Sequence, residues 1–276
     1  MSQTQIKIQR QAETADRHEL YQRAVQCPEA DIDFVDETFQ TLRGRPAQSL
    51  REDFCGTAAI CCEWVKRRSD NIATGIDIDE EVLDWGRDNN LSKLESEQTN
   101  RITLLQQNIL DTHTEPCDLI LAMNFSYWLL NQRDNLRNYF SQVLSMLKDD
   151  GIFFLDAYGG YDSFRNIKEE RTIDEDEPGS FTYTWEQERY EPISGQLISH
   201  IHFNFPDGSR LDRAFSYHWR LWTLPEIQDL LMEAGFGKVT IYWQGWDEDG
   251  NPDGIFVPTQ EADADAGWIC YICAEK

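Results

Sequence analysis

Two short segments constrain the fold of this 276-residue chain more than any others. In residues 50–58 (LREDFCGTA), a predicted strand breaks into a turn of small residues that opens directly into a helix. In residues 74–79 (TGIDID), a strand ends in the carboxylate of Asp77. In a nucleotide-binding α/β sheet, the glycine of such a turn lets a ligand approach the backbone, and an acid about 20 residues later accepts hydrogen bonds from ribose hydroxyls. The pair therefore predicts a nucleotide-binding βαβ unit.

The chain between residues 48 and 157 alternates strands with helices. The predicted strands are 49–54, 72–77, 101–106, 118–123 and 151–157, and the predicted helices lie near 58–68, 79–89 and 133–148. Strands that alternate with helices favour a parallel sheet with helices on both faces.

The segments on either side have a different character. After an acidic stretch (168–179) that we interpret as a loop or frayed helix, three runs of β-formers separated by turns predict an antiparallel meander. Thr223 and Glu226 have capping-box spacing and predict a helix to residue 234, followed by a strand (238–243), an acidic loop (247–266) and a terminal strand (267–274). The predicted parts are an N-terminal helical cap (1–47), a cofactor-binding core (48–160), an inserted substrate cap (161–222) and the C-terminal part of the core (223–276).

The composition excludes several classes of partner. A net charge of −25 argues against a nucleic acid, because clustered Lys and Arg must neutralise phosphates. Small molecules, especially neutral or cationic ones, are the expected ligands. No apolar run reaches membrane-spanning length and the N-terminus is polar, so we expect a cytoplasmic protein without a membrane partner. The seven cysteines are expected to be reduced, and no metal site is expected.

The turn after the first strand indicates what kind of nucleotide ligand fits. A dinucleotide fingerprint needs several glycines to admit a diphosphate, whereas this turn has only Gly56. Glu52 and Asp53 precede it and would repel phosphate. Acids at this place suit a nucleoside with a positively charged end, such as S-adenosylmethionine.

The chain resembles the class I S-adenosylmethionine-dependent methyltransferases over essentially its whole length. Their motif acid-apolar-Gly-Cys-Gly-Thr-Gly falls on residues 52–58, with Phe54 and Ala58 in place of two glycines. The resemblance implies a Rossmann-like, mostly parallel seven-stranded sheet with helices on both faces, an antiparallel last strand and an inserted antiparallel β meander. It also implies S-adenosyl-L-methionine as the cofactor.

The resemblance implies a role for individual residues too. Glu52 would support the methionine amino end, Asp77 would bind the ribose, and the end of the fourth strand would run past the methyl group. The positions assigned to cofactor binding are Tyr21, Glu52, Cys55, Gly56, Asp77, Ile78, Asn108, Ile109 and Asn124.

Two charged residues, Arg51 and Asp53, occupy strand positions that are normally apolar. Two charges on one face of a central strand are costly unless they are paired. They form either a buried ion pair or side chains that reach into the active site.

The acceptor side of the reaction is less constrained. Methyl transfer from a sulfonium chiefly needs alignment and exclusion of water, and a base only where the acceptor must lose a proton. Tyr127 and His200 are the candidate catalytic residues. The acidic composition favours a small-molecule acceptor, such as an amine, and the aromatic meander could equally form a homodimer interface.

Two other functions are compatible with the same pattern. One is a nicotinamide- or flavin-dependent oxidoreductase on a similar sheet, and the other is a non-catalytic methyltransferase-like binding protein.

Overall fold

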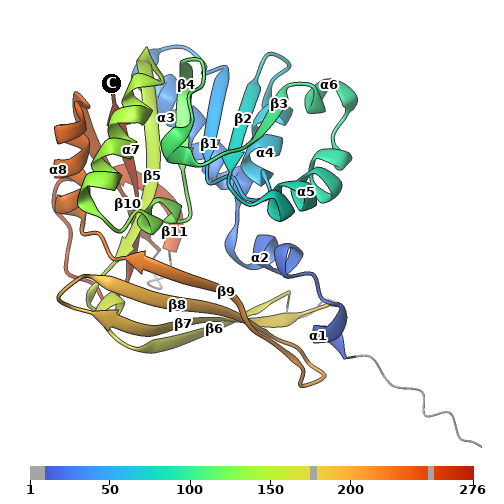
Figure 1. Cartoon of the computed structure of the whole chain (residues 1–276). Helices are drawn as coiled ribbons and strands as arrows, with labels where there is room; N and C mark the ends of the chain where they lie inside the picture. The colour runs from blue at the N-terminus through green and yellow to red at the C-terminus, as the bar shows by residue number, and fades with distance from the viewer. Residues whose placement is uncertain (1–9, 175–178, 248–251) are drawn as a thin grey trace, which may run out of the picture. The chain divides into compact units, whose positions relative to one another are not determined.

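The computed structural model describes residues 10–174, 179–247 and 252–276, and these fall into two compact units (Figure 1). The smaller unit comes from Met1–Gln26 and Phe164–Trp219, and the larger from Cys27–Ser163 and Arg220–Lys276. The α-helices are α1 (Gln11–Thr14), α2 (Arg17–Val25), α3 (Pro28–Arg43), α4 (Ala59–Arg67), α5 (Glu80–Asn89), α6 (Ser96–Thr99), α7 (Arg133–Ser145) and α8 (Leu224–Ala234). Short 3₁₀ turns are η1 (Leu91–Lys93), η2 (Ile109–Asp111), η3 (Ser126–Leu129) and η4 (Tyr161–Phe164).

The larger unit is built on an eight-stranded sheet. In spatial order its strands are β11 (Pro252–Pro258), β10 (Lys238–Trp246), β12 (Trp268–Glu275), β5 (Leu147–Gly159), β4 (Cys117–Ala122), β1 (Ser49–Asp53), β2 (Ile72–Asp77) and β3 (Ile102–Gln106). The strands from β5 to β3 are parallel to their neighbours, whereas β12 is antiparallel to both β5 and β10. The predicted Rossmann-like sheet with an antiparallel last strand is therefore confirmed.

The eighth strand corrects the prediction that residues 247–266 form a loop. Within that segment, β11 pairs with β10 through residues 252–258. Phe256 packs its ring against Phe34 and Tyr271 at centroid distances of 5.9 and 4.5 Å. The strand was missed because the segment as a whole is acidic and contains only one short run of β-forming residues, Ile255 to Val257.

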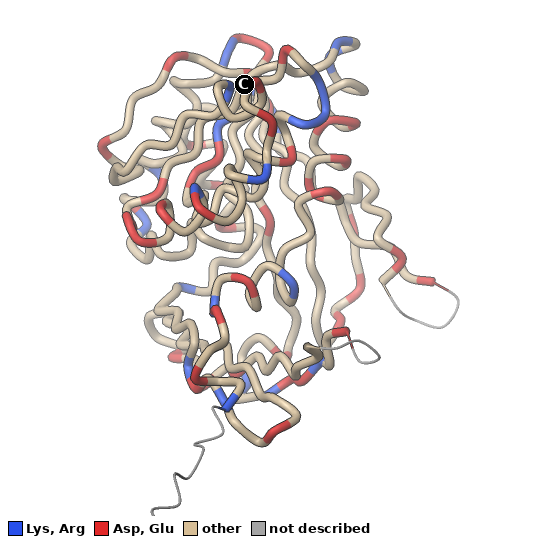
Figure 2. The backbone as a smooth tube through the Cα atoms, turned by 90° about the vertical axis from the view of Figure 1, so that its right-hand side faces the viewer, with Lys and Arg blue, Asp and Glu red and all other residues tan. Residues whose placement is uncertain are grey.

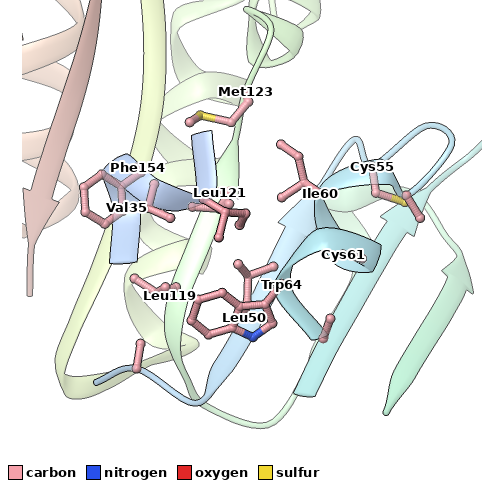
Figure 3. Close-up of a cluster of buried hydrophobic side chains, with 14 of the residues drawn as sticks. Val35, Leu50, Cys55, Ile60, Cys61, Trp64, Leu119, Leu121, Met123 and Phe154 are labelled. Atoms are coloured by element: carbon pink, nitrogen blue, oxygen red, sulfur yellow. The ribbon is translucent and has the colours of Figure 1, made fainter. Parts of the chain in front are cut away.

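Strand β1 lies in the interior of the larger unit, and all five of its residues are buried. Its side chains alternate between the two faces of the sheet. On one face Leu50 belongs to an apolar cluster with Trp64 of α4, Leu119 and Leu121 of β4, and Phe154 of β5 (Figure 3). On the other face lie Arg51 and Asp53. This packing fixes where β1 ends, and therefore where the turn after it begins.

The predicted helix signals are confirmed at α8. Thr223 accepts a hydrogen bond from the N–H of Glu226, and the Glu226 side chain accepts one from the N–H of Thr223. Gly235 ends the helix with a φ of 107°, in the left-handed region that glycine adopts without strain. Of the helices in the described ranges, none is both long and apolar enough to cross a membrane.

The smaller unit contains a four-stranded sheet rather than the predicted three-stranded meander. Its strands are β6 (Ile167–Ile173), β7 (Phe181–Glu191), β8 (Gln196–Asn204) and β9 (Arg210–Arg220), in that spatial order. The prediction of a loop or frayed helix is wrong for the beginning of the acidic stretch, which forms β6. Charges are tolerated there because β6 is an edge strand, and Lys168 pairs with Glu186 of β7 at 3.0 Å.

Helix α2 covers one face of this smaller sheet. Leu20 and Ala24 of the helix pack with Phe181, Ile201 and Phe203 of the strands. Over the whole sequence the 50 acidic residues outnumber the 25 basic ones, and Figure 2 shows Asp and Glu spread along the described chain rather than gathered in one segment.

Candidate cofactor site at the carboxyl ends of the strands

The turn after β1 keeps the backbone shape of a glycine-rich motif with only one glycine. The φ angles of Phe54, Gly56 and Ala58 are 56°, 51° and 56°, so alternate residues adopt the left-handed conformation. These are the three positions at which the resembling family has glycine. A non-glycine residue in that conformation costs about 1–2 kcal/mol. Phe54 and Ala58 therefore hold a strained backbone shape that the fold imposes on them.

Replacing Ala58 by glycine is expected to be unusually well tolerated. The side chain is fully buried, so the substitution loses a packed methyl group, but it also relieves the left-handed strain. Ala47 is equally buried and does not have a positive φ. Ala47→Gly therefore loses a methyl group without relieving any backbone strain. Urea unfolding should find Ala58→Gly about 1–2 kcal/mol less destabilising than Ala47→Gly. Equal losses of unfolding free energy in the two variants would contradict the proposal that Ala58 is strained.

Gly56 leaves open space at the top of the turn. A Cβ built on it would have no heavy atom within 4 Å, and its N–H donates to Oδ2 of Asp77 at 2.8 Å. Asp77 is the last residue of β2, and its Oδ1 accepts the N–H of Asp79 at 3.0 Å. Each carboxylate oxygen has a second lone pair for a further donor. The turn and the acid are thus joined, with acceptor capacity left on the acid.

Helix α5 supports the same turn from the other side. A Cβ on Gly86 would lie 2.6 Å from the carbonyl oxygen of Thr57, and Asn90 Nδ2 donates to that oxygen at 2.9 Å. The contact is with backbone, which cannot rotate away. Gly86 therefore permits the helix to approach the turn.

Gly86→Ala is expected to destabilise the protein, although Gly→Ala in a helix interior usually stabilises by about 1 kcal/mol. Overpacking against the turn should cost about 1–3 kcal/mol and weaken binding of S-adenosylhomocysteine. The control is Gly237→Ala, where the nearest atom to a new Cβ is 3.7 Å away. Urea unfolding and calorimetry measure the two effects, and a stabilised Gly86→Ala variant would refute the contact.

Glu52 and Cys55 lie beneath the turn. Glu52 is 5% exposed, and its Oε2 accepts hydrogen bonds from the N–H and the thiol of Cys61 at 3.2 and 3.0 Å. Burial, together with the smaller effect of the charges of Asp31 and Asp77, raises the pKa of Glu52 to about 8, although the hydrogen bonds from Cys61 lower it. Cys55 is also buried, against Gly75 of β2 (Figure 3).

The remaining residues predicted on the adenine side follow β2 and β3. Ile78 follows Asp77 directly and is 66% exposed. An exposed apolar side chain at this place is available to pack on the adenine ring of the cofactor. Asn108 is exposed, and its Oδ1 caps η2 by accepting the N–H of Leu110 at 3.0 Å. Ile109 is buried. The amide nitrogen of Asn108 thus remains as a donor where the resembling family usually has an Asp.

Asp156 is a buried acid that the sequence analysis missed. It lies on β5, and its two carboxylate oxygens accept the N–H groups of Asn124 and Phe125, each at 2.8 Å. Burial raises its pKa to about 7. A single carboxylate within the apolar run 152–158 (IFFLDAY) is the signal that could have found it.

A second missed acid, Asp31, lies on α3. Its Oδ1 accepts the hydroxyl of Tyr271 at 2.6 Å, and Phe34 stacks on the ring of Tyr271 at 4.2 Å. Burial raises the pKa of Asp31 to about 6. Tyr271 lies opposite Asp156 in the pairing of β12 with β5, so Asp31 and Asp156 are linked through Tyr271. The charge of Asp31 also raises the pKa values of Glu52 and Asp156. With Asp77 these three carboxyls form what we call the acid set.

The acid set predicts that stability falls as pH rises. The folded-state pKa values of Asp31, Asp156 and Glu52 (about 6, 7 and 8) lie above the ordinary values of 3.8, 3.8 and 4.5. Their contribution is therefore complete below the unfolded-state pKa values and is lost as pH rises through 6 to 8. The melting temperature should decrease from pH 5 to 9, and Glu52→Gln should flatten the upper part of that decrease. A melting temperature that rises between pH 6 and 8 would exclude this account.

Arg51 and Asp53 form the buried ion pair that was one of the two interpretations of their sequence. Arg51 Nε lies 2.6 Å from Asp53 Oδ1, and both side chains are at most 1% exposed. The Tyr139 hydroxyl donates to Asp53 Oδ2 at 2.8 Å. This pair faces α7, whereas Glu52 faces α4, so it lies on the opposite side of β1 from the acid set.

The two candidate catalytic residues both have their polar atoms engaged. Tyr127 is fully buried, and its hydroxyl donates to the carbonyl oxygen of Asp156 at 2.8 Å. His200 lies in the smaller unit on β8, and its ring nitrogens lie 2.8 Å from Ser216 Oγ and Glu188 Oε2. Tyr21 also lies in the smaller unit, on α2, with its ring 5.0 Å from that of Phe215. The roles of all three stay predictions.

Comparison with known proteins supports a methyltransferase. Residues 53–155 match the family model described as a methyltransferase domain. This part of the chain is therefore a methyltransferase domain, in agreement with the resemblance to the class I S-adenosylmethionine-dependent methyltransferases. Its cofactor is S-adenosylmethionine, and this assignment replaces the oxidoreductase interpretation.

Similar proteins agree with this assignment. A protein of Geobacillus sp. (strain WCH70), provisionally named a methyltransferase, is 23% identical over 215 residues, which are 75% of this chain and 81% of that protein. The structure of an S-adenosylmethionine-dependent methyltransferase from Clostridium acetobutylicum ATCC 824 has a TM-score of 0.64 at 19% identity, covering 92% of this chain and 96% of that one. An amino pentose methyltransferase from Micromonospora echinaspora has a TM-score of 0.67 at 11% identity, covering 94% and 96%. At these identities the two structures show a common fold.

Proposed function

We propose that this methyltransferase transfers a methyl group from S-adenosylmethionine to the nitrogen of a small amine. The observation that carries the proposal is the acid set: Asp77 and Glu52 at the turn after β1, Asp156 bound to the segment after β4, and Asp31 bound to Tyr271 of β12. An ammonium group compensates such charges, whereas a neutral or anionic acceptor does not. The name of the amino pentose methyltransferase supports an amine as well, at the level of the fold.

The residues of the turn fit S-adenosylmethionine better than a diphosphate. Gly56 leaves open space for close approach, and Asp77 keeps acceptor capacity for the two ribose hydroxyls. Glu52 lies beneath the same turn, where a carboxyl favours the cationic methionine end and disfavours phosphate. We therefore assign the ribose to Asp77 and the methionine end to the side of Glu52.

When bound, S-adenosylmethionine would supply an activated methyl group. The lone pair of an amine would attack the methyl carbon in line, the C–S bond would break, and S-adenosylhomocysteine would leave. The protein has to orient the nucleoside, exclude water and accept one proton from the amine. Glu52 has a pKa near 8, which suits proton acceptance near neutral pH, whereas both carboxylate oxygens of Asp156 are engaged by backbone N–H groups. We assign no step to Tyr127 or His200, because hydrogen bonds within the protein engage their polar atoms.

The acceptor class can be tested by methyl transfer from isotopically labelled S-adenosylmethionine to pairs of small molecules that differ only in an amine or a hydroxyl group. Label should appear in the amines and not in the matched alcohols. Transfer to the alcohols alone would refute the proposal. Calorimetric binding of S-adenosylmethionine without transfer to either class would favour the non-catalytic alternative instead.

A further inference from the structure

The segment that follows β4 has an unfavourable backbone conformation. Asn124 and Phe125 both have a φ of 56°, and neither is glycine. Two consecutive residues of this kind cost about 1–2 kcal/mol each, and such strain persists only where the surroundings fix it. In this part of a class I sheet the chain is expected to pass the transferred methyl group, so whatever holds the segment bears on the reaction.

Asp156 supplies the contacts that hold it. Its Oδ2 accepts the N–H of Asn124 and its Oδ1 accepts the N–H of Phe125, both at 2.8 Å. Its carbonyl oxygen accepts the hydroxyl of Tyr127 at 2.8 Å. One residue of β5 therefore binds three of the four residues from 124 to 127, just after β4. Successive N–H groups directed at one anion form a recognised anion-binding arrangement, which here is filled by the protein's own carboxylate.

We propose that the Asp156 carboxylate is a positioning residue that fixes Asn124 and Phe125 at the cofactor site, and that protonation of this carboxylate releases them. The part of this proposal that concerns Asp156, Asn124 and Phe125 can be tested in the protein without a ligand. Its consequence for catalysis rests on the proposed function.

The groups around Asp156 make protonation accessible near neutral pH. Asp31 of α3 adds negative charge, and Tyr271 of β12 lies directly opposite Asp156 in the strand pairing. The Tyr127 hydroxyl and the Cys270 thiol also lie near enough for Asp156 to raise their pKa values. Burial raises the pKa of Asp156 itself to about 7. Because an ionised carboxylate accepts both N–H groups and a protonated one loses an acceptor site, the clamp is complete only above that pH.

The direct test is a pH titration of the wild-type backbone amides by ¹⁵N NMR, in the protein without ligand. The amide resonances of Asn124 and Phe125 should shift together with a midpoint near 7 between pH 5 and 9, and the shift should disappear in Asp156→Asn. Glu52→Gln should leave it in place. Amides that do not titrate in the wild type would overturn the proposal, and this outcome does not depend on whether a variant folds.

Hydrogen exchange gives the second measurement. At pH 8, Asp156→Asn should accelerate exchange in residues 121–127 by a factor of about 10 or more, while exchange at residues 59–65 of α4 stays unchanged. Affinity for S-adenosylhomocysteine should fall below pH 7 in the wild type and be independent of pH in that range in Asp156→Asn. Unchanged exchange in residues 121–127 would refute the clamp. Titrating amides in a protein that does not bind S-adenosylhomocysteine would retain the clamp and refute the cofactor site.

Discussion

Asp53→Ala is expected to reduce the free energy of unfolding by about 3–5 kcal/mol. The substitution leaves the Arg51 guanidinium, 1% exposed, without its carboxylate partner at 2.6 Å. It also removes the acceptor of the Tyr139 hydroxyl. An unpaired charge in the interior is among the most costly changes that a single substitution can make. Urea unfolding at pH 7, followed by fluorescence, measures the loss.

The matched control removes the polar groups together. In the triple variant Arg51→Met, Asp53→Leu and Tyr139→Phe, no buried charge or hydroxyl of this network is left without a partner, so most of the stability should return. Binding of S-adenosylhomocysteine by this triple variant should resemble that of the wild type, because the pair faces α7 rather than the acid set. A loss below about 1 kcal/mol for Asp53→Ala would show that water reaches the pair.

Asp77→Ala should have the largest effect on ligand binding. The substitution removes the proposed ribose acceptor and also frees the N–H of Gly56, which Asp77 holds at 2.8 Å. Charge-assisted hydrogen bonds contribute about 1.5–3 kcal/mol each, so affinity for S-adenosylmethionine and S-adenosylhomocysteine should fall by roughly 100-fold or more. Calorimetry with both ligands measures the change.

Asp79→Ala is the control for Asp77→Ala, since it changes the same loop without touching the proposed ribose contact. Asp79 caps α5 by accepting the N–H of Glu81 at 3.0 Å, and its loss should cost about 1 kcal/mol of stability. Affinity should change little in this variant. Equal affinities for Asp77→Ala and the wild type would remove Asp77 from the site.

The order of strands and helices between residues 48 and 157 could be predicted because strands such as β4 and β5 contain short apolar runs, and helical periodicity lies between the strands. The buried but charged β1 was found instead through the turn that follows it. The turn after β1 shows where that reasoning ends. Phe54 and Ala58 are poor candidates for positive φ by residue type, yet both adopt it. The sequence analysis noted that both stand where the motif has glycine but did not predict their conformation, because it depends on the surrounding fold rather than on the residues themselves.

Asp31 could not be assigned to the site from the sequence for a similar reason, and for Asp156 the sequence signals burial but not the groups that it binds. Asp31 is one of many acids in the helical region 28–43, and nothing local distinguishes it from a solvated charge. Its hydrogen-bond partner Tyr271 lies 240 residues later in the chain. The importance of Asp156 likewise depends on two amides of the segment after β4. Long-range contacts of this kind leave little trace in local patterns.

The irregular outermost strand of the larger sheet has a consequence for self-association. Strand β11 begins and ends with proline, carries Gly254 at a φ of 75°, and faces a break in register between Gln244 and Trp246 of β10. Prolines lack the N–H that an incoming strand would need, and an uneven backbone cannot match a regular ladder. The edge strand β11 is therefore a poor template for the addition of a strand from another molecule, although Ile255 and Val257 are exposed there.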